Sequence, residues 1–95
     1  MLGHTGCGAV KGAIDDVKLG NLTGLLAKIR PAVTEANCGS SKDEACVAKV
    51  AELNVRQAMR EIRAKSPYLK TYLDDGKVGL VGAIYDVATG KVSYF

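Results

Sequence analysis

The sequence contains few of the residues that mark several large classes of protein function. Tryptophan is absent, only 5% of the residues are aromatic, and the formal net charge at pH 7 is only +3. Basic residues in the second half fall at roughly helical spacing, with almost no aromatic side chains among them. Nucleic-acid binding proteins combine a basic stripe with aromatic residues that stack on the bases. We therefore expect a solvated helix face there and no nucleic-acid partner.

Long hydrophobic runs are also absent. No stretch approaches the ~20 apolar residues of a membrane-spanning helix, so no membrane partner is expected. The 95 residues are 47% hydrophobic and 24% charged, which is typical of a globular protein. This length allows one domain, residues 1–95, with a thin core, and a second subunit would increase the buried surface.

Cysteines are few and odd in number, three in all. Cys7 lies in a glycine-rich opening, whereas Cys38 and Cys46 flank the polar segment GSSKDEA. Two interpretations of that pair stay open: a small disulfide loop in an oxidising compartment, or two free thiols in a reducing one. We expect a cytoplasmic protein, with the periplasm as the alternative if the two cysteines form a disulfide.

Apolar periodicity predicts helices over most of the first two thirds of the chain. Residues 9–17 predict a short helix, and residues 21–36 predict one that Asn21 caps and Pro31 breaks or kinks. A longer helix is expected from a Ser40 or Ser41 cap to about Ala64. Its expected buried stripe consists of Val47, Ala51, Val55, Ala58, Met59 and Ile62. Residues 66–76 predict a short helical turn that begins near Pro67.

Strands are predicted at both ends of the chain. Residues 2–4 resemble the end of a strand, and KVGLVGAIYDV, residues 77–87, is apolar almost without alternation. Such a run is typical of a strand covered on both faces by helices. The alternating KVSYF, residues 91–95, predicts an edge strand that forms a hairpin with it. The order of elements predicts an α/β fold with a mostly parallel central sheet, flanking helices and a C-terminal β-hairpin.

His4 and Cys7, in the opening MLGHTGCGAV, are the candidate metal ligands. Imidazole and thiolate are preferred zinc ligands, and residues three apart around a turn can converge on one ion, although a catalytic zinc needs a third protein ligand. The alternative without metal is a hydrogen-bonded histidine beside a buried thiol. A phosphate-binding loop is disfavoured because a full preceding strand and a ribose-binding acid are missing. A cysteine nucleophile would lack its orienting group.

The wider context of this motif resembles the second zinc motif of β-class carbonic anhydrases. In LGHTGCGAVKGAIDD a strand ends in Gly-His, two residues intervene, and Cys-Gly-Ala begins a helix. LLAKIRPAV, ELNVRQAMREI and LDDGKVGLVGAIYDVATGKVSYF follow in the family's order and spacing, so the resemblance covers essentially the whole chain. It implies a partial β-carbonic-anhydrase fold and zinc-dependent, reversible hydration of CO2 to bicarbonate and a proton. His4 and Cys7 then correspond to two of the three protein ligands of Zn2+, with the Gly8 and Ala9 amides at an anion-favouring turn.

One part of the family pattern is missing from these residues. The family's first zinc ligand lies in a Cys-x-Asp-x-Arg motif, which occurs nowhere in the 95 residues, and neither does its Asp-Arg dyad. We therefore expect a truncated, C-terminal portion of the fold that is inactive alone and whose catalytic residues are unknown.

Other readings of the assembly and activity stay open. With two strands missing, residues 79–86 should be left with an unpaired neighbour and an uncovered apolar face, which favours a homo-oligomer. Zinc shared between two copies through His4 and Cys7 is a further alternative. So are a non-catalytic scaffold and a relative that hydrolyses CS2 or COS.

Overall fold

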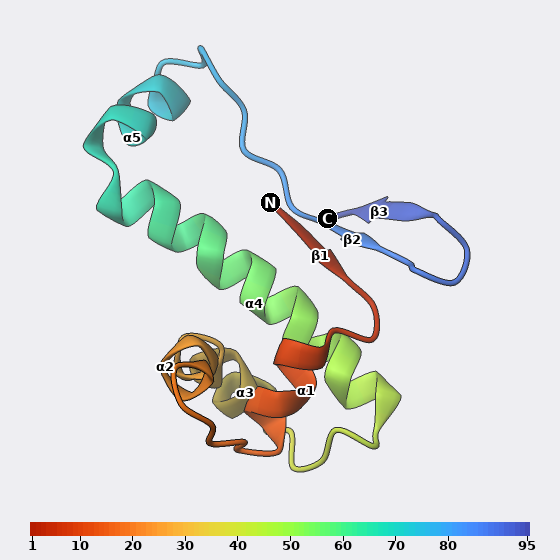
Figure 1. Ribbon diagram of the computed structural model, residues 1–95. Helices are drawn as coiled ribbons and strands as arrows, with labels where there is room; N and C mark the ends of the chain where they lie inside the picture. Colours follow the sequence, from red (N-terminus) through yellow and green to blue (C-terminus); the bar gives the residue numbers. More distant parts are fainter.

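The computed structural model describes all 95 residues as five helices and three short strands (Figure 1). In chain order the elements are β1 (Leu2–His4), α1 (Gly8–Ile14), α2 (Leu22–Ala27), α3 (Arg30–Ala36), α4 (Glu44–Lys65), α5 (Pro67–Asp74), β2 (Ala83–Tyr85) and β3 (Val92–Tyr94). Helices and strands therefore share one chain in the predicted order, and the α/β class is confirmed.

The sheet joins the two ends of the chain, with strand order β1-β2-β3. β1 runs parallel to β2, with Gly3 opposite Ile84, and β2 runs antiparallel to β3, with Ile84 opposite Ser93. The predicted C-terminal hairpin is thus confirmed, and the three strands contain one parallel and one antiparallel pair. β2 has a partner on each side, and its neighbour β1 has no partner along its other edge, as expected for the neighbour of residues 79–86. Among the three strands, the open edges belong to β1 and β3.

The prediction that residues 77–87 form a strand covered on both faces is wrong. Only Ala83–Tyr85 are in strand conformation, with Ala83 buried and Tyr85 exposed, and Val81 just before them is 59% exposed. α4 packs against β1 and β2 on one side and against α1 and α3 on the other, and α2 packs against α1 and α3. The apolar run is therefore covered on one face only, because no helix of this chain reaches the other face.

The first three helices lie where the sequence predicted them, but their ends differ from the predicted ones. α1 stops at Ile14, earlier than predicted, and Asp16 follows in the left-handed region with φ of 57°. The break at Pro31 is confirmed, since Pro31 lies in the first turn of α3. Asn21 occupies the N-cap position of α2, but its side chain makes no capping hydrogen bond. Instead, the Leu19 amide donates to Thr23 Oγ1 at 2.8 Å.

α4 begins with a different cap from the one predicted. Asp43, and neither Ser40 nor Ser41, is its N-cap, and the Asp43 carboxylate accepts from the Cys46 amide at 3.2 Å. Ser41 is unavailable because its amide and hydroxyl donate to Asp15. The helix ends at Lys65, next to the predicted Ala64.

The buried face of α4 follows the predicted stripe in its first half. Val47, Ala51 and Val55 are buried, and so is Val50, which the prediction omitted. The remaining members of the stripe, which are Ala58, Met59 and Ile62, are half-buried. Figure 1 shows the reason: the second half of α4 extends past α1–α3 toward α5. The main core therefore lies between α1–α3 and the first half of α4.

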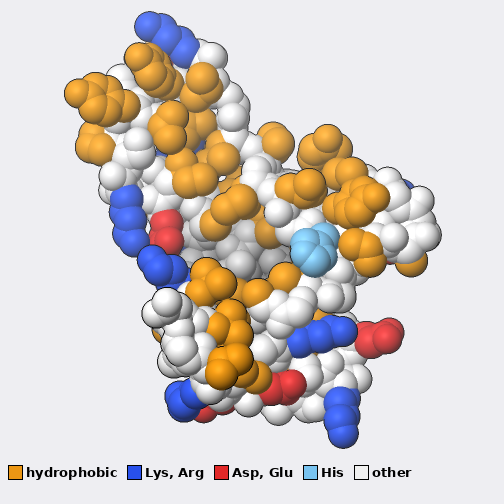
Figure 2. Space-filling model, viewed as in Figure 1, with side chains coloured by type: hydrophobic (Ala, Val, Ile, Leu, Met, Phe, Trp, Pro, Cys, Tyr) orange, Lys and Arg blue, Asp and Glu red, His pale blue; other side chains and the backbone are white.

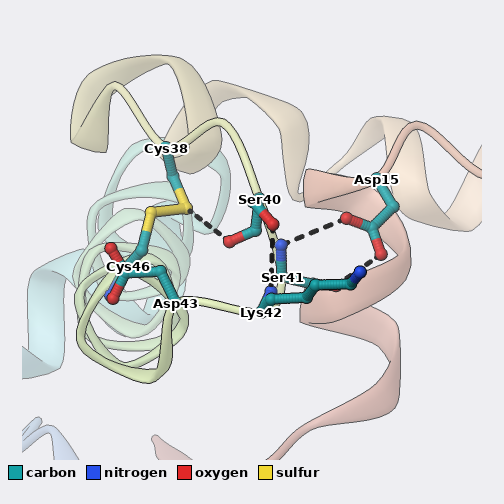
Figure 3. Close-up of a disulfide and its surroundings, with 7 residues drawn as sticks. All are labelled: Asp15, Cys38, Ser40, Ser41, Lys42, Asp43 and Cys46. Atoms are coloured by element: carbon teal, nitrogen blue, oxygen red, sulfur yellow. Dashed lines mark hydrogen bonds between the residues drawn. A yellow bond between two sulfur atoms is a disulfide. The ribbon is translucent and has the colours of Figure 1, made fainter.

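The segment between α3 and α4 is held at two points (Figure 3). A disulfide joins Cys38 to Cys46, with the two Cα atoms 5.7 Å apart. The Ser41 amide and hydroxyl donate to the Asp15 carboxylate at 3.1 and 2.5 Å, which ties the segment to the end of α1. These two hydrogen bonds lower the pKa of Asp15. Of the two interpretations of the cysteine pair, the structure contains the bridged one.

None of the five helices has both the length and the apolar composition that are needed to cross a bilayer.

Candidate metal centre

The two candidate ligands lie at the junction between β1 and α1. His4 is the last residue of β1, and Cys7 is the N-cap of α1, with its carbonyl accepting from the Lys11 amide at 3.0 Å. Gly6 between them has φ of 61°, a left-handed conformation that glycine adopts without a steric penalty. The glycine-rich turn therefore changes the direction of the chain within the two residues that separate His4 from Cys7, whose side chains are both of a kind that binds zinc.

His4 and Cys7 line the same pocket, of about 170 Å3. The remaining lining residues come from the N-terminal residue, β1, α1 and the middle of α4, and they are Met1, Leu2, Gly3, Val10, Ala51, Asn54 and Val55. The histidine is exposed, and Figure 2 shows it in pale blue at the surface, bordered by hydrophobic side chains. Cys7 is half-buried and is the free cysteine of the chain. The structure thus brings both predicted ligands to one mostly apolar pocket.

The imidazole of His4 is oriented by a backbone group that sequence reasoning missed. Nδ1 of His4 lies 2.8 Å from the carbonyl oxygen of Thr5. Because a carbonyl oxygen can only accept, Nδ1 carries the hydrogen, and Nε2 of the neutral ring keeps its lone pair. Metal-binding histidines commonly donate their second ring nitrogen in this way. The sequence contains no signal that selects the Thr5 carbonyl, because the contact depends on the shape of the turn.

The two donor side chains are of the types that bind zinc, but a zinc site needs more protein ligands than these two. Imidazole and thiolate suit zinc, but no group of three or more His, Cys, Asp or Glu side chains comes together in this chain. Cys38 and Cys46 are bonded to each other and cannot serve as thiolate ligands. Gly8 and Ala9 are the first two residues of α1, as expected, and their role at an anion-favouring turn stays a prediction.

Comparison with known proteins places this arrangement in a family. The family model for carbonic anhydrase matches residues 1–92. Among solved structures, the β-carbonic anhydrase CafA of the fungal pathogen Aspergillus fumigatus is 31% identical, with a TM-score of 0.81 over 99% of this chain and 46% of its own. The β-carbonic anhydrase CcaA is 23% identical, with a TM-score of 0.82 over 99% of this chain and 48% of its own.

A third solved structure is one of two tetrameric β-carbonic anhydrases from the filamentous ascomycete Sordaria macrospora. It is 20% identical, with a TM-score of 0.82 over 99% of this chain and 49% of its own. No curated protein matches the chain. The chain therefore spans about half the length of these solved structures. A family match over nearly every residue, together with the shared fold, leads to one assignment: the chain belongs to the β-class carbonic anhydrases.

Proposed function

We propose that this chain supplies the His-x-x-Cys part of a catalytic zinc site for the reversible hydration of CO2 to bicarbonate and a proton. The observation that carries the proposal is the placement of His4 and Cys7 in one pocket, with Nε2 of His4 left free by the hydrogen bond from Nδ1 to Thr5. A neutral imidazole with a free nitrogen and an unpaired thiol are the two donor types that zinc prefers.

The roles of the chain's own residues follow from their positions. A zinc ion held by these residues would supply a water of lowered pKa, about 7, and with it hydroxide near neutral pH. His4 and Cys7 would hold the ion, and the Thr5 carbonyl orients the His4 ring. Leu2, Val10 and Val55 line the pocket with apolar surface, which suits an uncharged substrate such as CO2.

A third protein ligand has to come either from a part of the polypeptide outside residues 1–95 or from a second copy of the chain. A catalytic zinc keeps three protein ligands and one open position, and this chain places two donors in the pocket. We therefore expect little CO2 hydration from residues 1–95 alone.

We also propose self-association. The sheet and the residues just before β1 and β2 expose a group of hydrophobic side chains that line one shallow pocket, which are Met1, Leu2, Val81, Val92 and Tyr94. A contiguous exposed apolar surface of this kind favours contact with another protein surface.

The test combines a metal assay with a rate assay on the purified 95-residue chain. We expect weak zinc binding that is lost in His4→Ala and in Cys7→Ser, and a CO2 hydration rate close to that of buffer in stopped-flow pH-indicator experiments. Lys49→Ala is the control, because Lys49 lines a neighbouring pocket with His4 but is not a zinc-type donor. Equal zinc retention in all variants would contradict the ligand assignment. Enzyme-like turnover by the chain alone would contradict the need for a third ligand.

A second candidate function is a non-catalytic scaffold of the same family, which the incomplete donor set favours. Restoring the upstream half of the site separates the two. A protein extended to include a Cys-x-Asp-x-Arg segment should hydrate CO2 if the chain is part of an enzyme, and should stay inactive if it is a scaffold. Including carbonyl sulfide and carbon disulfide as competing substrates in that assay distinguishes a hydrolase of those compounds.

A further inference from the structure

Thr5 connects the candidate zinc ligand His4 to the C-terminal hairpin through three hydrogen bonds. The Thr5 amide donates to the Tyr85 carbonyl at 3.0 Å, and Thr5 Oγ1 accepts from the Val87 amide at 3.1 Å. The Thr5 carbonyl accepts from Nδ1 of His4 at 2.8 Å. The residue that orients the imidazole is therefore itself held by residues about 80 positions away in the sequence.

We propose that Thr5 is a positioning residue for the zinc ligand, and that the hairpin sets the orientation of the His4 ring through it. The Thr5 carbonyl belongs to the peptide bond that leads into Gly6, a residue with φ of 61° and open space where a side chain would be. Glycine permits many backbone conformations, so the turn alone does not hold this carbonyl in place. The two contacts to Tyr85 and Val87 do so instead.

The consequence for metal binding follows from the tautomer of the ring. While Nδ1 donates to the Thr5 carbonyl, Nε2 presents its lone pair, and a zinc ion meets a ligand that is already oriented. Without the hydroxyl of Thr5, the Val87 amide loses its acceptor and the carbonyl gains freedom to rotate. The ring then samples other orientations and the other tautomer. This inference rests on the proposed role of His4 as a zinc ligand, but its first readout does not require zinc.

A matched control lies in the same hairpin. Thr89 Oγ1 accepts from the Lys91 amide at 3.2 Å, a contact between a threonine hydroxyl and a backbone amide like that of Thr5. Thr89 makes no hydrogen bond with His4 or Thr5. Thr89→Val therefore removes an equivalent hydrogen bond from the hairpin and leaves the contacts of the imidazole unchanged.

The experiment uses nitrogen-15 NMR of the ring and metal titration of the 95-residue chain. The chain contains one histidine, so a single imidazole is observed, and the spectra are recorded at about pH 8.5, above the ordinary range of histidine pKa values. We expect the Nδ1–H tautomer to dominate in the wild type and to fall in Thr5→Val. Zinc and cobalt affinity should drop about tenfold in Thr5→Val and stay within about twofold of wild type in Thr5→Ser and Thr89→Val.

Several outcomes would overturn the proposal. If the Nδ1–H tautomer does not dominate in the wild type, the proposal is refuted. This measurement does not depend on the variants, so it remains a test even if the Thr5→Val protein fails to fold. An unchanged tautomer and affinity in Thr5→Val would refute it as well, and so would equal losses in Thr5→Val and Thr89→Val. The proposed function fails separately, if His4→Ala binds zinc as tightly as the wild type.

Discussion

The disulfide between Cys38 and Cys46 should account for a large share of the stability of this fold. The two residues have a sequence separation of 8. Closing a loop of that size removes about 8 cal/mol/K of chain entropy from the unfolded state, or about 2.5 kcal/mol at 25 °C. Ser41 remains hydrogen-bonded to Asp15 within the same segment. Reduction should therefore act mainly on the unfolded chain and leave the folded segment in place.

The effect should be large compared with the total stability. Folded domains typically have free energies of unfolding of about 5–15 kcal/mol. Because only 15 of the 95 residues are buried, we expect this chain to lie at the low end of that range. A loss of about 2.5 kcal/mol corresponds to a fall in the melting temperature of about 10–20 °C for a domain of this size. The reduced protein should consequently begin to unfold at markedly lower urea concentrations.

The assay is urea unfolding of the same protein with and without dithiothreitol, followed by circular dichroism. Cys7→Ser is the matched control, because Cys7 is the free cysteine and lies outside the loop; it should show the same response to reduction as the wild type. Thiol titration of the unreduced, denatured protein should give one free thiol. Three free thiols, or equal unfolding midpoints in the two conditions, would refute the reasoning.

Two further substitutions test individual contacts. Hydrogen bonds from Ser41 lower the pKa of Asp15. The stability that the Asp15 carboxylate contributes is therefore complete above the usual carboxyl pKa of about 4 and is lost as the pH falls through the lowered folded value. The difference in urea midpoint between wild type and Asp15→Asn should shrink on acidification, and a constant difference would contradict this. In Gly3→Ala, the new Cβ would lie 2.8 Å from Cγ2 of Val55. Val55 is β-branched and rigid in its helix, so we expect a loss of about 1–3 kcal/mol in thermal or urea unfolding. Gly79→Ala, where the Cβ meets open space, should cost clearly less, and equal losses would show that the contact with α4 is unimportant.

Local sequence signals predicted much of the fold. The apolar stripe of α4 placed that helix to within one residue at its C-terminal end, and Pro31 separated α2 from α3. These signals succeed because helix periodicity and the missing amide hydrogen of proline act within a few residues of the chain. The hairpin of β2 and β3 was predicted for the same reason, from an apolar run and an alternating segment on either side of a short turn.

The predictions that were wrong concern features that depend on competition between groups distant in the sequence. Ser41 is a good N-cap residue by itself, but its amide and hydroxyl donate to Asp15, the residue that follows α1, and Asp43 caps α4 instead. The apolar run 77–87 indicated a strand covered on both faces, whereas coverage depends on where the other helices pack. A pattern along one segment contains no information about either choice.

For the candidate site, too, some features follow from the sequence and others only from the tertiary structure. The residue types of the site, a histidine and a cysteine three positions apart around glycines, follow from the sequence, as does the family resemblance that the comparisons confirmed. Tertiary structure decided that Cys38 and Cys46 are joined, that the sheet is covered by α4 alone, and that the Thr5 carbonyl orients His4. The last of these depends on hydrogen bonds from Thr5 to Tyr85 and Val87. Only the folded path of the chain brings together groups that lie at its opposite ends.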